Sequence, residues 1–153
     1  SVGNFEARTS VGNKNIKCTH IFIPAIEKLQ QEGLKVELIF FHDVPNQKLR
    51  FYQVQADIVV DMLTFGWFGA NIREGLMLGK PCVCFLRPEW LESVKKEIPE
   101  YVEELPVISA TPETVYEVLK DLVTKAENYQ IIIKNYDYAV LVNRLKEFGY
   151  FIV

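Results

Sequence analysis

Two glycines bracket an aromatic turn near the middle of the chain, Gly66-Trp67-Phe68-Gly69, and a helical pattern follows from Ala70. Because Gly66 and Gly69 have no side chain, their backbone can approach a ligand closely. A helix that starts at Ala70 and Asn71 would present free amides and a partial positive charge, which favour a phosphate. The turn is therefore a candidate phosphate-binding loop. A purely structural turn is the alternative, since the spacing matches neither a dinucleotide-binding glycine motif nor a Walker motif.

Glu74 lies one turn beyond the start of this helical pattern, among residues that are mostly apolar. An ionised carboxylate accepts hydrogen bonds, and the paired hydroxyls of a ribose could donate two of them. Glu74 is therefore a candidate ribose-binding residue. Arg73 beside it supports the alternative of an ordinary charged helix face.

Three residues in other loops could contact the same ligand. Lys14 and Lys17 precede the first helical pattern, and their charges could neutralise a diphosphate. His42 follows an apolar run and could contact a nucleobase. Plain surface or capping roles are the alternatives, because surface lysines are common and His42 belongs to no Ser-His-Asp, Cys-His or His-x-x-x-His arrangement.

The three cysteines, Cys18, Cys82 and Cys84, fit neither a disulfide framework nor a zinc site by number and spacing. Cys82 and Cys84 are two residues apart in an apolar run, so strand alternation would place both on one face. We therefore expect buried, reduced thiols, no bound metal and an intracellular, cytoplasmic protein.

The elements that must position these residues alternate between helix and strand. Helical spacing covers 20–32, 47–55, 70–78, 89–104 and 111–125, and apolar runs typical of buried strands cover 35–41, 57–63, 82–86 and 106–109. Thr19 and Thr111 are expected as N-caps, and Gly33 as the end of the first helix. Residues 1–19 are predicted to form a loop, and residues 126–153 a C-terminal helical tail.

This alternation predicts an α/β fold, a Rossmann-like three-layer sandwich with a mainly parallel sheet and helices on both faces. In such a sheet, ligands bind beyond the carboxyl ends of the strands. The loops that contain Lys17, His42 and the Gly66–Gly69 turn all lie at that edge in the predicted order. The candidate residues are therefore expected to meet.

Composition limits the kind of protein. The chain has 153 residues, 49% of them hydrophobic, and a formal net charge of −3. That length fits one domain, residues 1–153, with a core of its own. The lack of a concentrated basic face argues against nucleic-acid binding. No apolar run reaches the roughly 18 residues that a membrane-spanning helix needs.

Several blocks of this sequence resemble the C-terminal, nucleotide-sugar-binding domain of group one, glycogen-synthase-like glycosyltransferases of the GT-B fold. The blocks are Ala56–Leu63 (ADIVVDML), Gly66–Gly69 (GWFG) and Arg73–Cys84 (REGLMLGKPCVC), against the family pattern ADIVVD, GW(Y/F)G and EAMALGKPVVC. Asn13–Thr19 (NKNIKCT) is similar to the family's NRxxKGT segment, and Leu105–Leu122 to its closing strand and helix. The resemblance covers residues 13–122.

The resemblance implies one lobe of a two-lobed enzyme that transfers a sugar from a nucleoside diphosphate sugar to an acceptor. By position, Glu74 matches the second Glu of the family's Glu-x7-Glu motif, which binds the ribose hydroxyls. Lys17 matches the lysine that contacts the diphosphate, and Lys14 stands where an Arg is usual. Backbone around Gly69, Ala70 and Asn71 would bind the distal phosphate or the sugar. Lysine charge and the helix terminus would neutralise the leaving diphosphate, so no metal and no separate cofactor are expected.

The sequence departs from the family pattern in three places. Gly66 stands where the first Glu of the motif is expected, and Cys18 replaces the glycine after the lysine. Residues 1–12 do not resemble the strand end that usually precedes this segment, and no initiator Met is present. We therefore expect an excised lobe that needs an N-terminal acceptor-binding lobe for turnover, and a peripheral membrane association through that lobe stays open.

Two other readings of the sequence remain. A degenerate Rossmann-like module that serves in binding or assembly would explain Gly66 and Cys18 without any transfer chemistry. A flavodoxin-like or receiver domain would need an acidic cluster or a flavin-binding loop at its first strand, and the polar opening segment contains neither.

Overall fold

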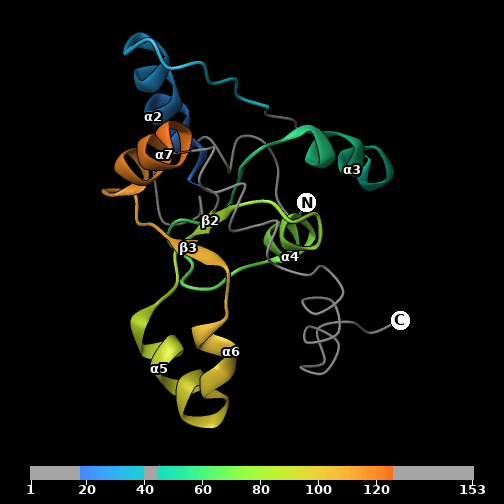
Figure 1. Cartoon of the computed structure of the whole chain (residues 1–153), viewed down its shortest axis with the longest axis vertical. Helices are drawn as coiled ribbons and strands as arrows, with labels where there is room; N and C mark the ends of the chain where they lie inside the picture. The colour runs from blue at the N-terminus through green and yellow to red at the C-terminus, as the bar shows by residue number, and fades with distance from the viewer. Residues whose placement is uncertain (1–17, 40–44, 126–153) are drawn as a thin grey trace.

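The structure, a computed structural model, describes residues 18–39 and 45–125 of the chain. Six helices and three strands lie in these ranges (Figure 1): α2 (Thr19–Gln31), α3 (Asn46–Gln55), β1 (Val59–Val60), α4 (Ala70–Met77), β2 (Cys82–Cys84), α5 (Pro88–Glu97), α6 (Pro99–Glu103), β3 (Val107–Ser109) and α7 (Val115–Thr124). Within the described ranges, helices and strands alternate much as the sequence predicts. The strands are shorter than the apolar runs that predicted them.

The three strands form one open parallel sheet in the order β1-β2-β3. Val83 of β2 is in register with Val60 of β1 and Ile108 of β3. Parallel neighbours need crossover connections, and α4 supplies the one from β1 to β2, while α5 and α6 supply the one from β2 to β3. The predicted α/β class with a parallel sheet is confirmed.

Strand β2 lies at the centre of the core, since Cys82, Val83 and Cys84 are all 0% exposed. Val83 contributes to an apolar cluster with α2 and α7, which includes Leu29, Leu63 and Leu119. Cys82 and Cys84 contribute to a second cluster with α4 and α6, which includes Ile72, Leu76 and Tyr101. Helices therefore pack on both sides of β2, and the prediction that Cys82 and Cys84 share a face is confirmed.

Two pairs of helices lie at opposite ends of the molecule (Figure 1). Helices α2 and α7 lie side by side at one end, and α5 and α6 at the other, with the sheet between them. Helix α3 lies beside α4.

The apolar run 35–41 was expected to be a strand, and its described part, 35–39, forms none. Lys35 and Glu37 alternate with apolar residues there and are exposed, while Leu34 and Val36 pack against the cluster around Val83. A strand buried on both faces cannot accommodate charged side chains on one of them. The rest of the run lies outside the described residues, as do residues 1–17 of the predicted loop 1–19 and the tail 126–153.

The predicted helix 89–104 is two helices, because Pro99 interrupts it. Proline has no N–H group and disfavours the α conformation in the residue before it. Ile98 accordingly has φ −141° and ψ 75°, which ends α5 and lets α6 begin at Pro99.

The predicted caps are also wrong in detail. Thr19 is the first residue of α2 rather than its cap, and its Oγ1 is buried without a hydrogen-bond partner among the described residues. Cys18 occupies the cap position instead. Thr111 begins a turn before α7, in which its carbonyl accepts from the Val115 amide at 2.9 Å, and Thr114 takes the cap position.

Gly75 allows α4 to pack closely against the sheet. A Cβ atom at this position would lie 2.7 Å from Cys82 Sγ and 2.9 Å from Val59 Cγ2. We expect Gly75→Ala to destabilise the protein, because overpacking costs about 1–3 kcal/mol and exceeds the gain in helix propensity of about 1 kcal/mol. Urea unfolding of the full chain would measure the difference.

Gly33→Asn is the matched control for this substitution. Gly33 has φ +86° and no atom within 4 Å of an added Cβ, and asparagine tolerates the left-handed conformation. Its effect should be smaller than that of Gly75→Ala. Equal stability of the Gly75→Ala variant and the wild type would show that α4 is not held against the sheet as described.

Helices α2 and α7 are also joined by a polar contact at Glu32. Lys120 Nζ lies 2.8 Å from Glu32 Oε2, and Tyr116 donates a hydrogen bond to the same carboxylate. Both bonds lower the pKa of Glu32, the bond from Lys120 more than the bond from Tyr116. The bond to Glu32 in turn raises the pKa of Lys120. Lys28 lies over the Tyr116 ring, 3.8 Å from its centroid.

The Glu32 contact predicts a pH dependence of stability. A carboxyl group whose pKa is lower in the folded than in the unfolded protein stabilises the folded state at pH values above the unfolded pKa. This stabilisation is lost as the pH falls through the folded pKa. Glu32→Gln should therefore lower the melting temperature at neutral pH by a few degrees at most and flatten its decline in acid. Thermal unfolding from pH 7 to 3 would test this, with Glu92→Gln on α5 as control. Parallel curves for wild type and Glu32→Gln would contradict the prediction.

Candidate functional site

The candidate site lies where the parallel strands end. The loop 61–69 leaves β1, the segment 85–87 leaves β2, and the segment 110–114 leaves β3. The Phe85 amide donates to the Met62 carbonyl at 3.2 Å, and the Ala110 amide donates to the Cys84 carbonyl at 3.0 Å. These bonds continue the sheet pairing into the loops and hold the three strand ends at one edge.

The Gly66–Gly69 turn is anchored at its first glycine. Gly66 has φ +100°, and its carbonyl accepts a hydrogen bond from the Arg87 amide at 2.8 Å. A Cβ atom on Gly66 would lie 2.9 Å from Arg87 Nε. Both the backbone conformation and the Arg87 side chain therefore exclude a side chain at position 66.

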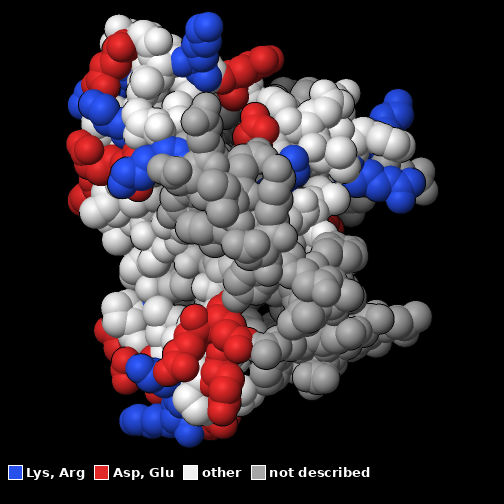
Figure 2. All heavy atoms as spheres, in the orientation of Figure 1, with Lys and Arg blue, Asp and Glu red and all other residues white. Residues whose placement is uncertain are grey.

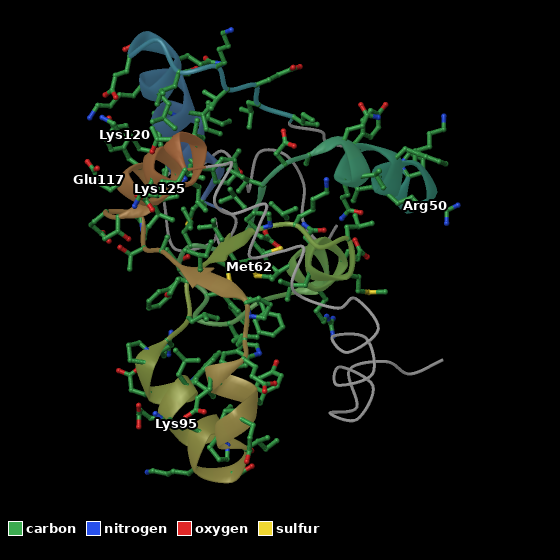
Figure 3. The ribbon with its side chains drawn as sticks, in the orientation of Figure 1. Arg50, Met62, Lys95, Glu117, Lys120 and Lys125 are labelled. Carbon is green, nitrogen blue, oxygen red and sulfur yellow. The ribbon has the colours of Figure 1, made fainter. Side chains whose placement is uncertain are left out.

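Gly69 is the N-cap residue of α4 and has an extended backbone, with φ −103° and ψ −164°. The Arg73 amide donates to its carbonyl at 3.3 Å, and no described side chain caps this helix end. A Cβ atom on Gly69 would overlap the terminal methyl of Met62, which is labelled in Figure 3 beside the sheet. The first turn of α4, with Ala70 and Asn71, therefore begins at a residue where a side chain would require the Met62 side chain to move.

Glu74 lies one turn further along α4 and is exposed. Gln53 Nε2 donates a hydrogen bond to Glu74 Oε2 at 2.7 Å, which joins α3 to α4. Gln53 was not expected at this site, because nothing in the sequence pairs two exposed residues that are 21 positions apart.

The structure therefore brings five of the expected residues together on one turn and one helix: Gly66, Gly69, Ala70, Asn71 and Glu74. Lys14, Lys17 and His42 lie outside the described residues. Their expected places at the site stay predictions.

Cys18 begins α2 at this same edge. Its Sγ donates to Thr64 Oγ1 at 3.5 Å, which links the start of α2 to the loop after β1. Cys18 has φ 52° and ψ 34°, a left-handed conformation that favours glycine. The residue for which the resemblance expects glycine therefore has a glycine-like backbone conformation.

Asp61 is the buried acidic residue of the site, with 3% of its surface exposed. Its Oδ1 accepts from the Met62 amide at 3.1 Å, and Met62 has φ 38°. In the sequence, Asp61 is an acidic residue near the end of the apolar run 57–63, a position that fits a structural or a binding role alike. The bond to Met62 shows a structural contact at the strand end.

The cysteines of β2 are unsuited to nucleophilic chemistry. Burial raises the pKa of Cys82 to about 12, with a further contribution from Cys84. Burial also raises the pKa of Cys84 to about 12, and the negative charge of Asp61 adds to it. Because the thiolate is the reactive form, these thiols act as small apolar side chains at neutral pH. All three cysteines are buried thiols without a disulfide bond, as expected.

The described residues contain neither a metal-binding cluster nor a membrane-spanning helix. No group of three or more His, Cys, Asp or Glu side chains in 18–39 and 45–125 is arranged to hold a metal ion. In the same ranges, no helix has the length and apolar character needed to cross a membrane.

The chain was compared with protein family models, with curated proteins and with solved structures, and none of them matches it.

Proposed function

We propose that this chain is the nucleotide-sugar-binding lobe of a GT-B glycosyltransferase, which transfers a sugar from a nucleoside diphosphate sugar to an acceptor. The parallel sheet and the two apolar clusters on opposite sides of β2 support a Rossmann-like three-layer arrangement for this lobe. An N-terminal lobe of the same enzyme would bind the acceptor.

The observation that carries the proposal is that a helix start and an exposed carboxylate lie on the same helix, α4. Gly69, Ala70 and Asn71 start α4 without a side-chain cap among the described residues, and Glu74 follows on the same helix. At a rise of 1.5 Å per residue, Glu74 lies about 6 Å along the axis from Ala70. A nucleotide lying along α4 could then place its phosphates at the amides and its ribose at the carboxylate.

Gln53 strengthens the proposed role of Glu74. A carboxylate has two oxygens with about four acceptor positions, and the Gln53 amide uses one of them at Oε2. The bond restrains the side chain of an exposed residue, which lowers the entropy cost of binding a ribose. The remaining acceptor positions suit two neighbouring hydroxyls.

The remaining contacts of the proposed site come from residues outside the described ranges. Lys17 directly precedes Cys18, which begins α2 at the same edge of the sheet. In the proposal, Lys14 and Lys17 neutralise the leaving diphosphate together with the end of α4, and His42 contacts the base.

A binding module without transfer activity is the second candidate. The observation that favours it is the Arg87 side chain beside Gly66, where the family pattern has a Glu. A guanidinium in that space cannot act as the missing carboxylate. Nucleotide binding without any sugar transfer by the complete protein would select this candidate.

We expect the full chain to bind at least one of UDP, GDP and ADP in isothermal titration calorimetry. Glu74→Ala should weaken that binding about tenfold, because it removes charge-assisted hydrogen bonds to the ribose. The 2′-deoxy form of the same nucleotide should bind the wild type more weakly, and Glu74→Ala should reduce this difference.

Glu117→Ala is the matched control, since Glu117 is an exposed residue of α7 (Figure 3), away from the sheet edge. Its affinity should equal that of the wild type. No binding of any of the three nucleotides, or unchanged binding by Glu74→Ala, would overturn the site assignment.

A further inference from the structure

A cluster of aromatic side chains adjoins the candidate site. The rings of Trp67 and Phe68 are stacked, with centroids 5.1 Å apart. Trp90 of α5 lies 6.4 Å from Trp67 and 6.1 Å from Phe65, and the latter pair is edge to face. Phe65 is 45% exposed and Trp90 is 38% exposed, whereas Phe68 is buried. We call Phe65, Trp67 and Trp90 the aromatic platform.

Arg87 supplies a positive charge at this platform. Its guanidinium lies over the Trp90 ring, with Cζ 4.9 Å from the ring centroid. Its backbone is fixed by the hydrogen bond to Gly66, and its side chain lies in the space next to the Gly66 Cα. Arg87 is exposed and forms no ion pair with a described residue. No ion pair within the described ranges therefore uses its guanidinium donors, which a ligand could bind.

The cluster combines two kinds of contact that one ligand could use together. Aromatic faces bind the apolar C–H face of a sugar ring, and a planar guanidinium binds a carboxylate through two parallel hydrogen bonds. Phe65, Trp90 and Arg87 are exposed, so this cluster adds little to the buried core. This arrangement is typical of a binding site.

We propose that Arg87 and the aromatic platform bind a sugar ring that carries a carboxylate, a hexuronate. The ring packs on the exposed aromatic side chains, and its carboxylate accepts hydrogen bonds from Arg87. The choice of a sugar rests on the proposed function, whereas the choice of an acidic one rests on Arg87. The sugar belongs either to the donor, next to the turn that starts α4, or to an acceptor.

The charges around the platform favour a small ligand over a polyanion. Figure 2 shows both acidic and basic side chains at the α5–α6 end of the molecule. Helix α5 exposes Lys95 and Lys96, and these two lysines are outnumbered by the exposed carboxylates of α5 and α6. The carboxylates are Glu89, Glu92, Glu97, Glu100 and Glu103. A nucleic acid or an anionic membrane would extend over these carboxylates and be repelled. A single carboxylate needs only the guanidinium.

Tryptophan fluorescence tests the proposal directly, because Trp67 and Trp90 are the two tryptophans of the whole chain. The full chain is titrated with the methyl glycosides of glucuronic, galacturonic and mannuronic acid, each beside its neutral counterpart, and with inorganic phosphate. We expect a saturable change with at least one uronate, with an affinity about tenfold above that for its neutral sugar, as a charge-assisted hydrogen-bond pair supplies. Phosphate should compete weakly or not at all.

Arg87→Gln should remove the preference for the acidic sugar while the aromatic platform stays in place. The matched control is Arg50→Gln on α3, since Arg50 also lies near an aromatic ring, that of Phe51, at 5.5 Å. Circular dichroism and thermal melting would verify that both variants fold. No preference for the acid in any of the three pairs, an unchanged preference in Arg87→Gln, or saturation by phosphate at the same concentration would overturn the proposal.

Calorimetry with UDP-glucuronate, UDP-glucose and UDP distinguishes the two sources of the sugar. Tighter binding of UDP-glucuronate than of UDP-glucose, lost in Arg87→Gln, assigns the site to the donor. A response to a free glycoside without this difference assigns it to the acceptor. Because the methyl glycosides contain no nucleotide, failure of nucleotide binding would overturn the proposed function and leave the fluorescence test valid.

Discussion

Burial of β2 on both faces is the constraint on which the rest of the structure depends. A three-residue strand with no exposed surface must have all its side chains covered and all its amides and carbonyls paired. Val83 directs one face toward α2 and α7, and the two cysteines direct the other toward α4. The small, protonated thiols leave space for α4 to approach through Gly75, which a larger side chain at position 82 would prevent.

The same strand determines where the loops begin. Because β2 pairs with both β1 and β3, the residues that follow all three strands leave from one edge, and backbone hydrogen bonds there extend the pairing into the loops. Three of the five left-handed residues in the described ranges lie at this edge, Cys18, Met62 and Gly66, whereas Gly33 and Gly79 end helices. Such conformations at non-glycine residues persist only where the surroundings impose them. The geometry of the edge is therefore imposed by the core beneath it.

The sequence predicted what depends on periodicity and composition. Apolar runs located β1, β2 and β3, and the glycines at 66, 69 and 79 located the ends of the turn and of α4. The break at Pro99 follows from the rule for the residue before proline, and the long amphipathic pattern around it concealed the break. Lys35 and Glu37 show why no strand forms in the described part, 35–39, since the run is apolar on average but charged at these two alternate positions.

Contacts between distant residues could not be predicted in this way. Gln53 reaches Glu74, and Arg87 reaches Gly66, only because the fold brings α3 beside α4 and the end of β2 beside the turn. The residue types of the site could be read from the chain, but the partners that orient them could not. Gln53 therefore entered the candidate site only with the structure, and so did the contacts of Arg87 with Gly66 and Trp90.

The two proposed sites share one structural element, the Gly66–Gly69 turn. Its first residue is hydrogen-bonded to Arg87 of the aromatic site, and its last residue starts α4, which carries Glu74. The Arg87 backbone amide donates a hydrogen bond to Gly66, which lies four residues before the start of α4 at Ala70. A ligand bound to the Arg87 guanidinium therefore contacts a residue that also holds the turn in place. At Gly66, where the family pattern behind the proposed function has a Glu, the lack of a side chain leaves room for this cation. Under the proposed function, the charge beside the turn is thus positive where the family pattern has a negative one, and a positive charge is what an acidic sugar requires.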